Sequence, residues 1–338
     1  MTLSLIIRKF KKYLDIWVHS TLLQFSALCG AYGIGVTVFL IAKLAVGEHI
    51  LVISILSNGA HLLTLFCIPA LLLTLIVKDY RFPWSLYLLP GTLAFILWYG
   101  GDFLPKFPVA ADPEAIDIRV MTYNTKDSGI AVGFVAENSM DADIVGLQEV
   151  IPRMDNQFDN LYQRDTKAVF THYPIVSEQP ISIYRLNSNR TIAAVKIEVE
   201  ISNHVVSVYS LHAFRPSLTI RPFVYVTDLR YRDIQALVNA VASDPNPAIV
   251  LCDCNFSDQT EDYKLMTTQL HDTWKERGMG LGLTAPAPAG EGDFPFLLLR
   301  SDYIWHTDEF EAIAIDVMPI DLSDHYPVIA QLRFHIND

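Results

Sequence analysis

Long apolar runs dominate the first hundred residues of the chain. Three of them, residues 21–46, 50–77 and 83–100, are separated only by short polar connections, and each is close to the ~20 residues that a helix needs to cross the hydrocarbon core of a membrane. The pattern predicts three transmembrane helices. A cleaved signal peptide is the alternative for the first run, but this run is long, lacks a small-residue cleavage pattern at its end and is followed at once by a second apolar run.

The basic residues around these runs predict their orientation. Four Lys and Arg residues lie between positions 8 and 12, and Lys78 and Arg81 lie in the connection between the second and third runs. Because cytoplasmic loops carry an excess of Lys and Arg, we expect the N-terminus in the cytoplasm. Three crossings then place everything after residue 100 on the extracytoplasmic side of the cell membrane.

From about residue 116 the pattern changes to short β-rich runs that alternate with amphipathic stretches. The predicted strands cover residues 118–123, 144–148, 192–199, 205–211, 248–252, 302–306 and 328–334. Helices are predicted over residues 129–140 and 229–243, the second with one apolar face. This is an α/β pattern, and roughly 220 residues are enough for one well-buried core.

Composition and charge support this division. The chain of 338 residues is 51% hydrophobic and only 18% charged, which is too apolar for one ordinary soluble domain and excludes a disordered chain. The first 109 residues carry eight Lys and Arg against four Asp and Glu, whereas the remaining 229 carry 17 against 33, a formal charge of −16. We therefore expect a cytoplasmic N-terminus (1–20), three transmembrane helices (21–100), a proline-containing linker (101–117) and a globular domain (118–338).

Polar side chains stand where the predicted strands end or begin. They are Asn124, Glu149, His212, Asp253, Asn255, Asp302 and His325. Each alone has a structural explanation, since an acid such as Glu149 can cap the next element and Asp253 with Asn255 can form an Asx-rich turn. Strand ends, however, present side chains to clefts, so their shared position favours one functional site.

Six segments in this order resemble the endonuclease/exonuclease/phosphatase superfamily. They are VMTYN at 120–124, DIVGLQEV at 143–150, SLH at 210–212, DCN at 253–255, SDYI at 301–304 and SDHYPV at 323–328. With the three-helix anchor, the whole chain resembles the membrane-bound bacterial branch of that superfamily. The resemblance implies a DNase I-like, four-layer α/β sandwich, in which helices flank two mainly antiparallel sheets and the site lies at one end.

The resemblance also implies a metal site. By the family's pattern Glu149 is the main Mg²⁺ ligand, Asn124 lies beside it, and Asp324 supports the metal directly or through water. Oxygen ligands of this kind suit Mg²⁺ or Mn²⁺ better than Zn²⁺. The expected cofactor is therefore Mg²⁺ or Mn²⁺.

Five further residues take catalytic roles by the same resemblance. Asp253 positions or deprotonates the attacking water, and Asn255 and His212 form hydrogen bonds to the pentacovalent phosphate. His325 is the base or a phosphate contact, and Asp302 orients it. The implied reaction is hydrolysis of a phosphodiester or phosphomonoester by a metal-activated water.

The sequence departs from the family's pattern at two places. Lys126 stands where some nucleases of the family carry a second acidic ligand, which puts a two-metal mechanism in doubt. Cys252 and Cys254 replace the usual glycine and phenylalanine around the Asp-x-Asn motif. Because a disulfide between residues i and i+2 would be strained, we expect these cysteines to be small, buried side chains.

Charge and location favour a lipid-like substrate. A domain of charge −16 has no electrostatic reason to attract a nucleic-acid backbone, whereas a hydrolase anchored at the outer leaflet meets lipid headgroups at high local concentration. Arg215 and Arg221 lie in an apolar and basic loop after His212 and are the candidate substrate-binding residues, although an ordinary covering loop explains them slightly better. The predicted function is a membrane-anchored, metal-dependent phosphoesterase that acts on a phospholipid-like or small phosphoester.

Two other classes stay open at this stage. An extracytoplasmic metal-dependent nuclease would use the same catalytic residues, and a basic groove in the folded domain would favour it. A non-catalytic membrane receptor that keeps the fold would be expected to have lost metal ligands, but the principal positions are all present.

Overall fold

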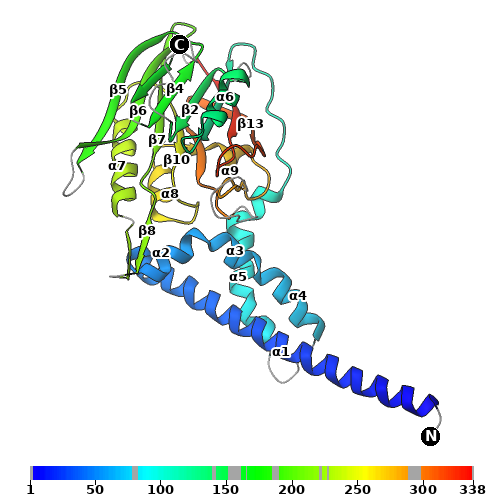
Figure 1. Ribbon diagram of the computed structural model, residues 1–338. Helices are drawn as coiled ribbons and strands as arrows, with labels where there is room; N and C mark the ends of the chain where they lie inside the picture. The colour runs from blue at the N-terminus through cyan, green and yellow to red at the C-terminus, as the bar shows by residue number, and fades with distance from the viewer. Residues whose placement is uncertain are drawn as a thin grey trace. The chain divides into compact units, whose positions relative to one another are not determined.

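The computed structural model describes residues 3–77, 83–138, 142–150, 161–164, 166–184, 190–220, 223–226, 228–287 and 298–336. The chain divides into two compact units, Met1–Gly101 and Asp102–Asp338, which are described separately below (Figure 1).

The first unit is helical. Its elements are α1 (Leu3–Val46), the 3₁₀ turn η1 (Gly47–His49), α2 (Leu51–Asn58), α3 (Ala60–Leu65), α4 (Cys67–Val77) and α5 (Trp84–Tyr99), followed by the 3₁₀ turn η2 (Gly100–Phe103) at the junction of the units. Helix α5 packs closely on α1, because a Cβ atom at Gly33 would come within 2.6 Å of the Tyr87 carbonyl oxygen. Small residues therefore allow these two backbones to approach.

The apolar run 50–77 is not one continuous helix. It is interrupted at Gly59 and again at Phe66, where α2, α3 and α4 meet. Side chains near the first break bond to backbone carbonyls, as Asn58 Nδ2 does to the Ser54 oxygen at 2.9 Å. Such local hydrogen bonds compete with helix geometry, which the apolar pattern alone does not reveal.

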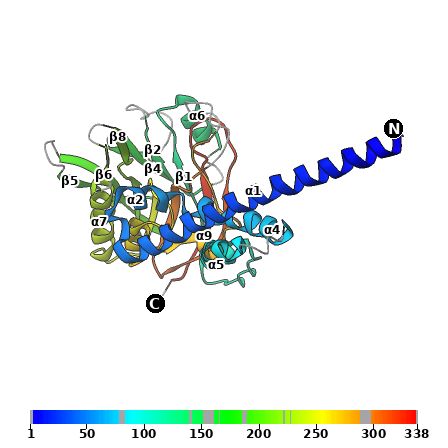
Figure 2. The ribbon, with the colours of Figure 1, turned by 90° about the horizontal axis from the view of Figure 1, so that it is seen from below.

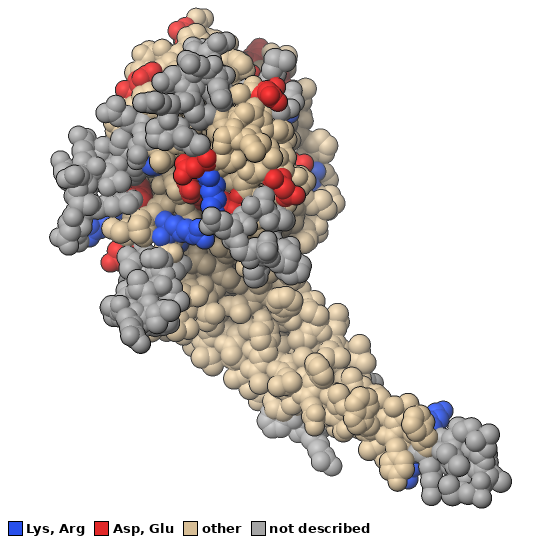
Figure 3. Space-filling model, in the orientation of Figure 1, with Lys and Arg blue, Asp and Glu red and all other residues tan. Residues whose placement is uncertain are grey.

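Two helical stretches of the described chain, Phe10–Val46 and Ala60–Val77, are long and apolar enough to cross a membrane. Many large apolar side chains on their surfaces are exposed, among them Leu28, Leu44 and Ile76. In the view of Figure 3 the middle of this unit shows almost no charged residues, and Lys and Arg appear at its N-terminal end. Helix α5 has only 16 residues, so a third crossing stays a prediction.

The second unit contains two six-stranded sheets. The first sheet has the order β13 (Phe310–Val317), β14 (Val328–Phe334), β1 (Ile116–Asn124), β2 (Ile144–Gln148), β4 (Lys167–Thr171) and β3 (Leu161–Arg164). The second has the order β11 (His271–Asp272), β12 (Asp302–His306), β10 (Ala248–Asp253), β7 (His204–His212), β6 (Arg190–Ile201) and β5 (Ile175–Tyr184). Each sheet is antiparallel except for one parallel pair, β1 with β2 and β7 with β10.

The remaining elements of this unit are short or lie outside the sheets. A separate hairpin joins β8 (Ser217–Ile220) to β9 (Phe223–Val226). The helices are α6 (Gly129–Asn138), α7 (Asp228–Ala242), α8 (Glu261–Met266) and α9 (Thr273–Arg277).

The two sheets pack face to face and helices cover their outer faces (Figure 1, Figure 2). Apolar side chains of both sheets form the central core, including Val120 of the first and Val208 and Ile249 of the second. Helix α6 packs on the outer face of the first sheet and α7 on that of the second. This arrangement confirms the predicted DNase I-like sandwich of two sheets with flanking helices.

Candidate active site

The strand registers gather the predicted polar residues at one end of the sandwich. In the first sheet, Asn124 at the end of β1 lies opposite Gln148 at the end of the parallel strand β2, and Glu149 follows directly. In the second sheet, Asp253 at the end of β10 lies opposite both His212 of β7 and Asp302 of β12. Polar residues that are far apart in the sequence therefore meet because their strands end at the same edges.

Asn124 joins the two sheets within this cluster. Its Nδ2 atom donates to Glu149 Oε1 at 3.0 Å and to Asp253 Oδ2 at 2.7 Å. His212 Nε2 lies 3.4 Å from the same Glu149 oxygen and 3.5 Å from the same Asp253 oxygen. The buried Asn124 amide and the half-buried His212 imidazole thus both contact two carboxylates, one from each sheet.

Asn255 is fixed at the rim of the cluster by the backbone around it. The residue has a positive φ of 52°, its Nδ2 donates to the Ala213 carbonyl at 3.0 Å, and its backbone N–H donates to Asp253 Oδ1 at 3.2 Å. Fully buried Arg230 of α7 donates to the Asn255 carbonyl at 2.5 Å and pairs with Asp262. Arg230, which the sequence did not single out, therefore positions the turn that carries Asn255.

His325 forms an ion pair with Asp302 on the other side of Asp253. Its Nδ1 lies 2.8 Å from Asp302 Oδ2, and this oxygen also accepts from Thr284 and Ser301. Burial opposes a charged imidazole, but the carboxylates of Asp302 and Asp253 outweigh it and raise the pKa of His325 to about 10. His325 is therefore an imidazolium at neutral pH, and its Nε2 lies 3.9 Å from Asp253 Oδ2.

Burial shifts the pKa values of the other two central groups in opposite senses. It lowers the pKa of His212, with Lys167 adding to the effect and Asp253 opposing it, so this imidazole is neutral at neutral pH. It raises the pKa of the Asp253 carboxyl, although His325 opposes the shift. A carboxylate with a raised pKa is a better proton acceptor near neutral pH.

Two lysines near this cluster were not among the site residues predicted from the sequence. Lys126, two residues after Asn124, donates from Nζ to Asp324 Oδ2 at 2.6 Å. Lys167 of β4 is 5% exposed and lies opposite Gln148 in the sheet. For Lys126, the departure from the family's pattern at this position was a signal that could have identified it. No feature of the sequence distinguishes Lys167.

The donor groups present fit a divalent cation near Glu149. Glu149, His212 and Asp253 each offer a ligand atom, and these atoms lie within 4.8 Å of one another. Asp253, Asp302 and His325 form a second such group, in which His325 Nδ1 already pairs with Asp302. Asp324, predicted as a metal ligand, has Oδ2 bonded to Lys126 and is in neither group of the described residues.

The predicted substrate-binding residues are less well defined. Arg215 is exposed, three residues after His212, and Arg221 lies outside the described residues. The apolar and basic segment around them forms the β8–β9 hairpin. Its contact with a substrate stays a prediction.

Cys252 and Cys254 are fully buried, as expected, but the expectation that they do not form a disulfide is wrong. The two residues form a disulfide on either side of Asp253, with their Cα atoms 5.2 Å apart. Alternate residues of an extended segment share a face, and this Cα separation lies within the range that a disulfide spans.

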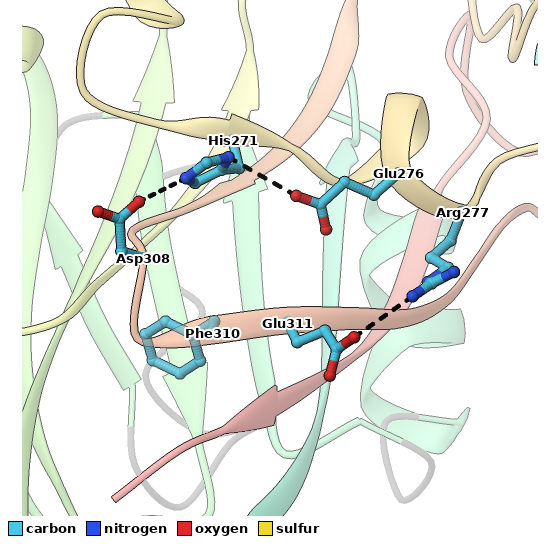
Figure 4. A pocket seen from close by; sticks show the side chains of 6 residues that line it. All are labelled: His271, Glu276, Arg277, Asp308, Phe310 and Glu311. Atoms are coloured by element: carbon cyan, nitrogen blue, oxygen red, sulfur yellow. Dashed lines mark hydrogen bonds and ion pairs between the residues drawn. The ribbon is translucent and has the colours of Figure 1, made fainter. Parts of the chain in front are cut away.

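A second polar cluster lies at the opposite end of β12 (Figure 4). His271 Nε2 contacts Asp308 Oδ1 at 2.5 Å, and its Nδ1 lies 3.7 Å from Glu276 Oε1. Because each ring nitrogen faces a different carboxylate, this imidazole bridges β11, α9 and the turn before β13. The cluster is separate from the site at Asp253, and its side chains are largely exposed.

The comparisons with known proteins agree with this geometry. The sequence model of the Endonuclease/Exonuclease/phosphatase family matches residues 127–325, which begin just after Asn124 and include Glu149 and His325. The chain belongs to the endonuclease/exonuclease/phosphatase family. No curated protein matches the sequence significantly.

Solved structures of this family share the fold of the second unit. An endonuclease/exonuclease/phosphatase family protein from Bacteroides thetaiotaomicron is 14% identical, with 66% of this chain and 99% of that chain covered and a TM-score of 0.53. A family protein from Bacteroides vulgatus is 17% identical, with 65% and 100% covered and a TM-score of 0.52. A mannosyl-6-phosphatase from Bacteroides thetaiotaomicron is 14% identical, with 64% and 99% covered and a TM-score of 0.51. At these identities the likeness shows the fold alone.

Membership of the endonuclease/exonuclease/phosphatase family assigns a general chemistry. The fold is that of metal-dependent phosphoesterases and nucleases, and acidic and histidine side chains suited to a divalent cation meet at the sheet ends.

Proposed function

We propose that this protein is a membrane-anchored phosphoesterase that uses Mg²⁺ or Mn²⁺ to hydrolyse a phospholipid-like or small phosphoester outside the cytoplasm. The observation that carries the proposal is the cluster of Glu149, Asn124, His212 and Asp253 beside the His325–Asp302 ion pair. It combines oxygen donors for a cation, a proton acceptor and a fixed positive charge within one site.

Glu149 would hold the cation, with Asn124 beside it. A bound Mg²⁺ or Mn²⁺ would neutralise charge that develops on the phosphate oxygens and the leaving group. Asn124 holds Asp253 toward Glu149, so the Asp253 carboxylate is placed to orient a water molecule and accept its proton. The raised pKa of Asp253 suits this role.

The phosphate would be held by the groups around Asp253. The His325 imidazolium can donate from Nε2 because Asp302 occupies its Nδ1. This arrangement favours a phosphate contact for His325 over a general base, since a group with a pKa of about 10 is already protonated at neutral pH. His212 borders the same space and would donate a further hydrogen bond to the phosphate. Asn255 Nδ2 donates to the Ala213 carbonyl and to Asp253 Oδ2 at 3.3 Å, and it would exchange the second of these bonds for one to the phosphate.

Three observations support the membrane location. Two helical stretches of the described chain meet the length and hydropathy of a membrane span, and the basic cluster before them predicts a cytoplasmic N-terminus. The disulfide between Cys252 and Cys254 is typical of proteins in oxidising compartments outside the cytoplasm. A hydrolase domain tethered on the outer side of the membrane favours lipid headgroups or small phosphoesters as substrates.

The test uses the full-length protein in detergent and in phosphatidylcholine–phosphatidylglycerol vesicles. We expect hydrolysis of bis-p-nitrophenyl phosphate, p-nitrophenyl phosphate or the vesicle lipid, with Mg²⁺ or Mn²⁺ and not with EDTA. The ratio of diester to monoester turnover then selects the substrate class, and the mannosyl-6-phosphatase among the structural neighbours makes sugar monophosphates worth including.

Variants and alternative substrates decide the outcome. Glu149→Gln should lower turnover by ~10²-fold or more because it removes a cation ligand, whereas Glu178→Gln, at an exposed position of β5, should not change it. Cleavage of DNA without hydrolysis of any ester or lipid would favour the nuclease instead. Absence of turnover on every substrate would contradict enzymatic activity and favour a receptor.

A further inference from the structure

Lys126 lies on a turn that is tied to the candidate site at both ends. Its backbone has a positive φ of 47°, and its N–H donates to Asn124 Oδ1 at 3.0 Å. Asp127, with φ of 54°, donates its N–H to the Glu149 carbonyl at 2.7 Å. A left-handed backbone is uncommon for such residues and persists where the surroundings hold it, often at functional sites. The turn therefore fixes the backbone position from which the Lys126 side chain extends.

The ammonium of Lys126 is anchored by one carboxylate. Nζ lies 2.6 Å from Asp324 Oδ2, with 34% of the Lys126 side chain and 12% of the Asp324 side chain exposed. Within the described chain this is the one acceptor that the ammonium contacts. Since an ammonium has three N–H donors, two remain available to an incoming ligand.

The loop that carries Asp324 is itself fixed to the site. Ser323 Oγ donates to the Asn124 carbonyl at 2.7 Å, and His325 follows Asp324 directly. Lys126 thus lies between Asn124, on the cation side of the site, and His325, on the expected phosphate side.

A second divalent cation on Asp324 would compete with this ammonium. Nζ already lies 2.6 Å from Asp324 Oδ2. A divalent cation on this carboxylate would therefore lie beside the ammonium, and like charges at such a short distance repel. The Lys126 ammonium therefore already supplies, at Asp324, the positive charge that a second cation would bring there.

We propose that Lys126 is the fixed cation of a one-metal site, where its ammonium donates to a non-bridging oxygen of the substrate phosphate and keeps a second divalent cation off Asp324. The proposal rests on the proposed phosphoesterase function and names an additional substrate-contacting residue. Its ligand is a phosphate group, whether from a lipid headgroup or a soluble ester.

The first test counts bound metal without any turnover. Full-length protein in detergent is titrated with Mn²⁺ and followed by electron paramagnetic resonance. We expect one Mn²⁺ that Glu149→Gln removes and Asp324→Asn keeps. Lys126→Asp should bind a second Mn²⁺, since Asp tolerates a left-handed backbone and adds a carboxylate. A second Mn²⁺ in the unmodified protein that Asp324→Asn removes would overturn the proposal.

The second test asks whether Lys126 contacts phosphate. Binding of inorganic phosphate to the Mn²⁺-loaded protein is measured by calorimetry for Lys126→Met, Lys126→Arg and the exposed control Lys264→Met. We expect Lys126→Met to weaken phosphate binding at least tenfold, and Lys126→Arg and Lys264→Met to change it less than threefold. Equal phosphate affinity in Lys126→Met and the unmodified protein would contradict the proposal.

Kinetics separate this proposal from the proposed function. With an active enzyme, Lys126→Met should lower kcat/KM by ~10²-fold, and Lys126→Arg should recover most of it. Full activity in Lys126→Met refutes the role of Lys126 and leaves the phosphoesterase intact. If the unmodified protein hydrolyses nothing, the proposed function fails, while the metal count and phosphate affinity still decide whether Lys126 is the fixed cation.

Discussion

The two histidines of the site differ in charge although both lie beside the Asp253 carboxylate. His325 keeps its proton because Asp302 is bonded to Nδ1 at 2.8 Å, whereas the carboxylates near His212 lie at 3.4 Å and 3.5 Å and Lys167 adds positive charge. The close contact with Asp302, together with the nearby Asp253 carboxylate, offsets the cost of burying the charge on His325. One imidazole is therefore fixed as a cation and the other as a neutral donor or acceptor.

Removing the partner of His325 should shift the pH dependence of activity. The activity of the unmodified enzyme should persist to about pH 10 on the basic side, because the imidazolium is lost only there. In Asp302→Asn the largest stabilising charge is gone and burial lowers the pKa, so the basic limb should move down by several pH units. The measurement is kcat/KM against pH for both proteins, and superimposable basic limbs would contradict the assignment.

The same ion pair contributes to folding stability with a defined sign. The pKa of His325 is raised in the folded protein, so the contribution is fully present below pH 6.5, the ordinary value, and is lost as pH rises through about 10. Because this contribution depends on pH, the stabilities of Asp302→Asn and of the unmodified protein should be compared at the same pH.

Individual site residues were predictable only where the sequence marks a strand end. Asn124, His212 and Asp253 follow apolar runs, and the registers place them together as expected. The partner of Lys126 is 198 positions away in the sequence, and Thr284 reaches Asp302 from an irregular segment. Contacts of this kind depend on tertiary structure, so no local pattern could predict them.

At the scale of elements, the spacing between the sheets is set by Gly146 in the middle of β2. A Cβ atom at this position would lie 2.5 Å from Leu251 Cβ of β10 in the facing sheet. Neighbouring strand residues on both sides are fully buried. The sheets can therefore pack closely at this point only with glycine.

Gly146→Ala should consequently destabilise the sandwich. Overpacking a dense core typically costs ~1–3 kcal/mol, which corresponds to a fall in Tm of roughly 3–10 °C for a domain of this size. Gly133→Ala is the matched control, because no atom lies within 4 Å of that added Cβ in helix α6. Thermal unfolding of the purified protein measures both, and an unchanged Tm in Gly146→Ala would show that the sheets adjust freely.

The interior strands except β4 were predictable, and the edge strands were not. The apolar runs of β1, β2, β7 and β10 gave their positions within one or two residues, because both of their faces are buried. Strand β5 lies at an edge and contains Pro180 with Glu178, so it lacks a strand pattern. The breaks within the run 50–77 could not be predicted, because apolar composition alone does not indicate where a helix is interrupted.

At the scale of the whole molecule, the chain consists of an apolar helical unit with basic residues near its N-terminus, followed by an acidic α/β unit. The division follows from composition alone. The number of crossings does not, since α5 is shorter than the two stretches that meet the length of a membrane span.

Cysteine labelling on intact cells tests the proposed topology. Ala111→Cys, at an exposed position after the helical unit, should react with a membrane-impermeant maleimide, whereas Lys12→Cys should react only after the cells are lysed. The unmodified protein controls for Cys29 and Cys67. Labelling of Lys12→Cys and not Ala111→Cys on intact cells would reverse the orientation, and labelling of both would require an even number of crossings.

The most direct measurement of the central claim is metal-dependent hydrolysis of bis-p-nitrophenyl phosphate by the full-length protein after EDTA treatment. The account predicts that Mg²⁺ or Mn²⁺ restores turnover in the unmodified protein and in Glu178→Gln, and that neither ion restores it in Glu149→Gln. Turnover that is independent of metal, or equal in Glu149→Gln and the unmodified protein, would contradict the assignment of this site.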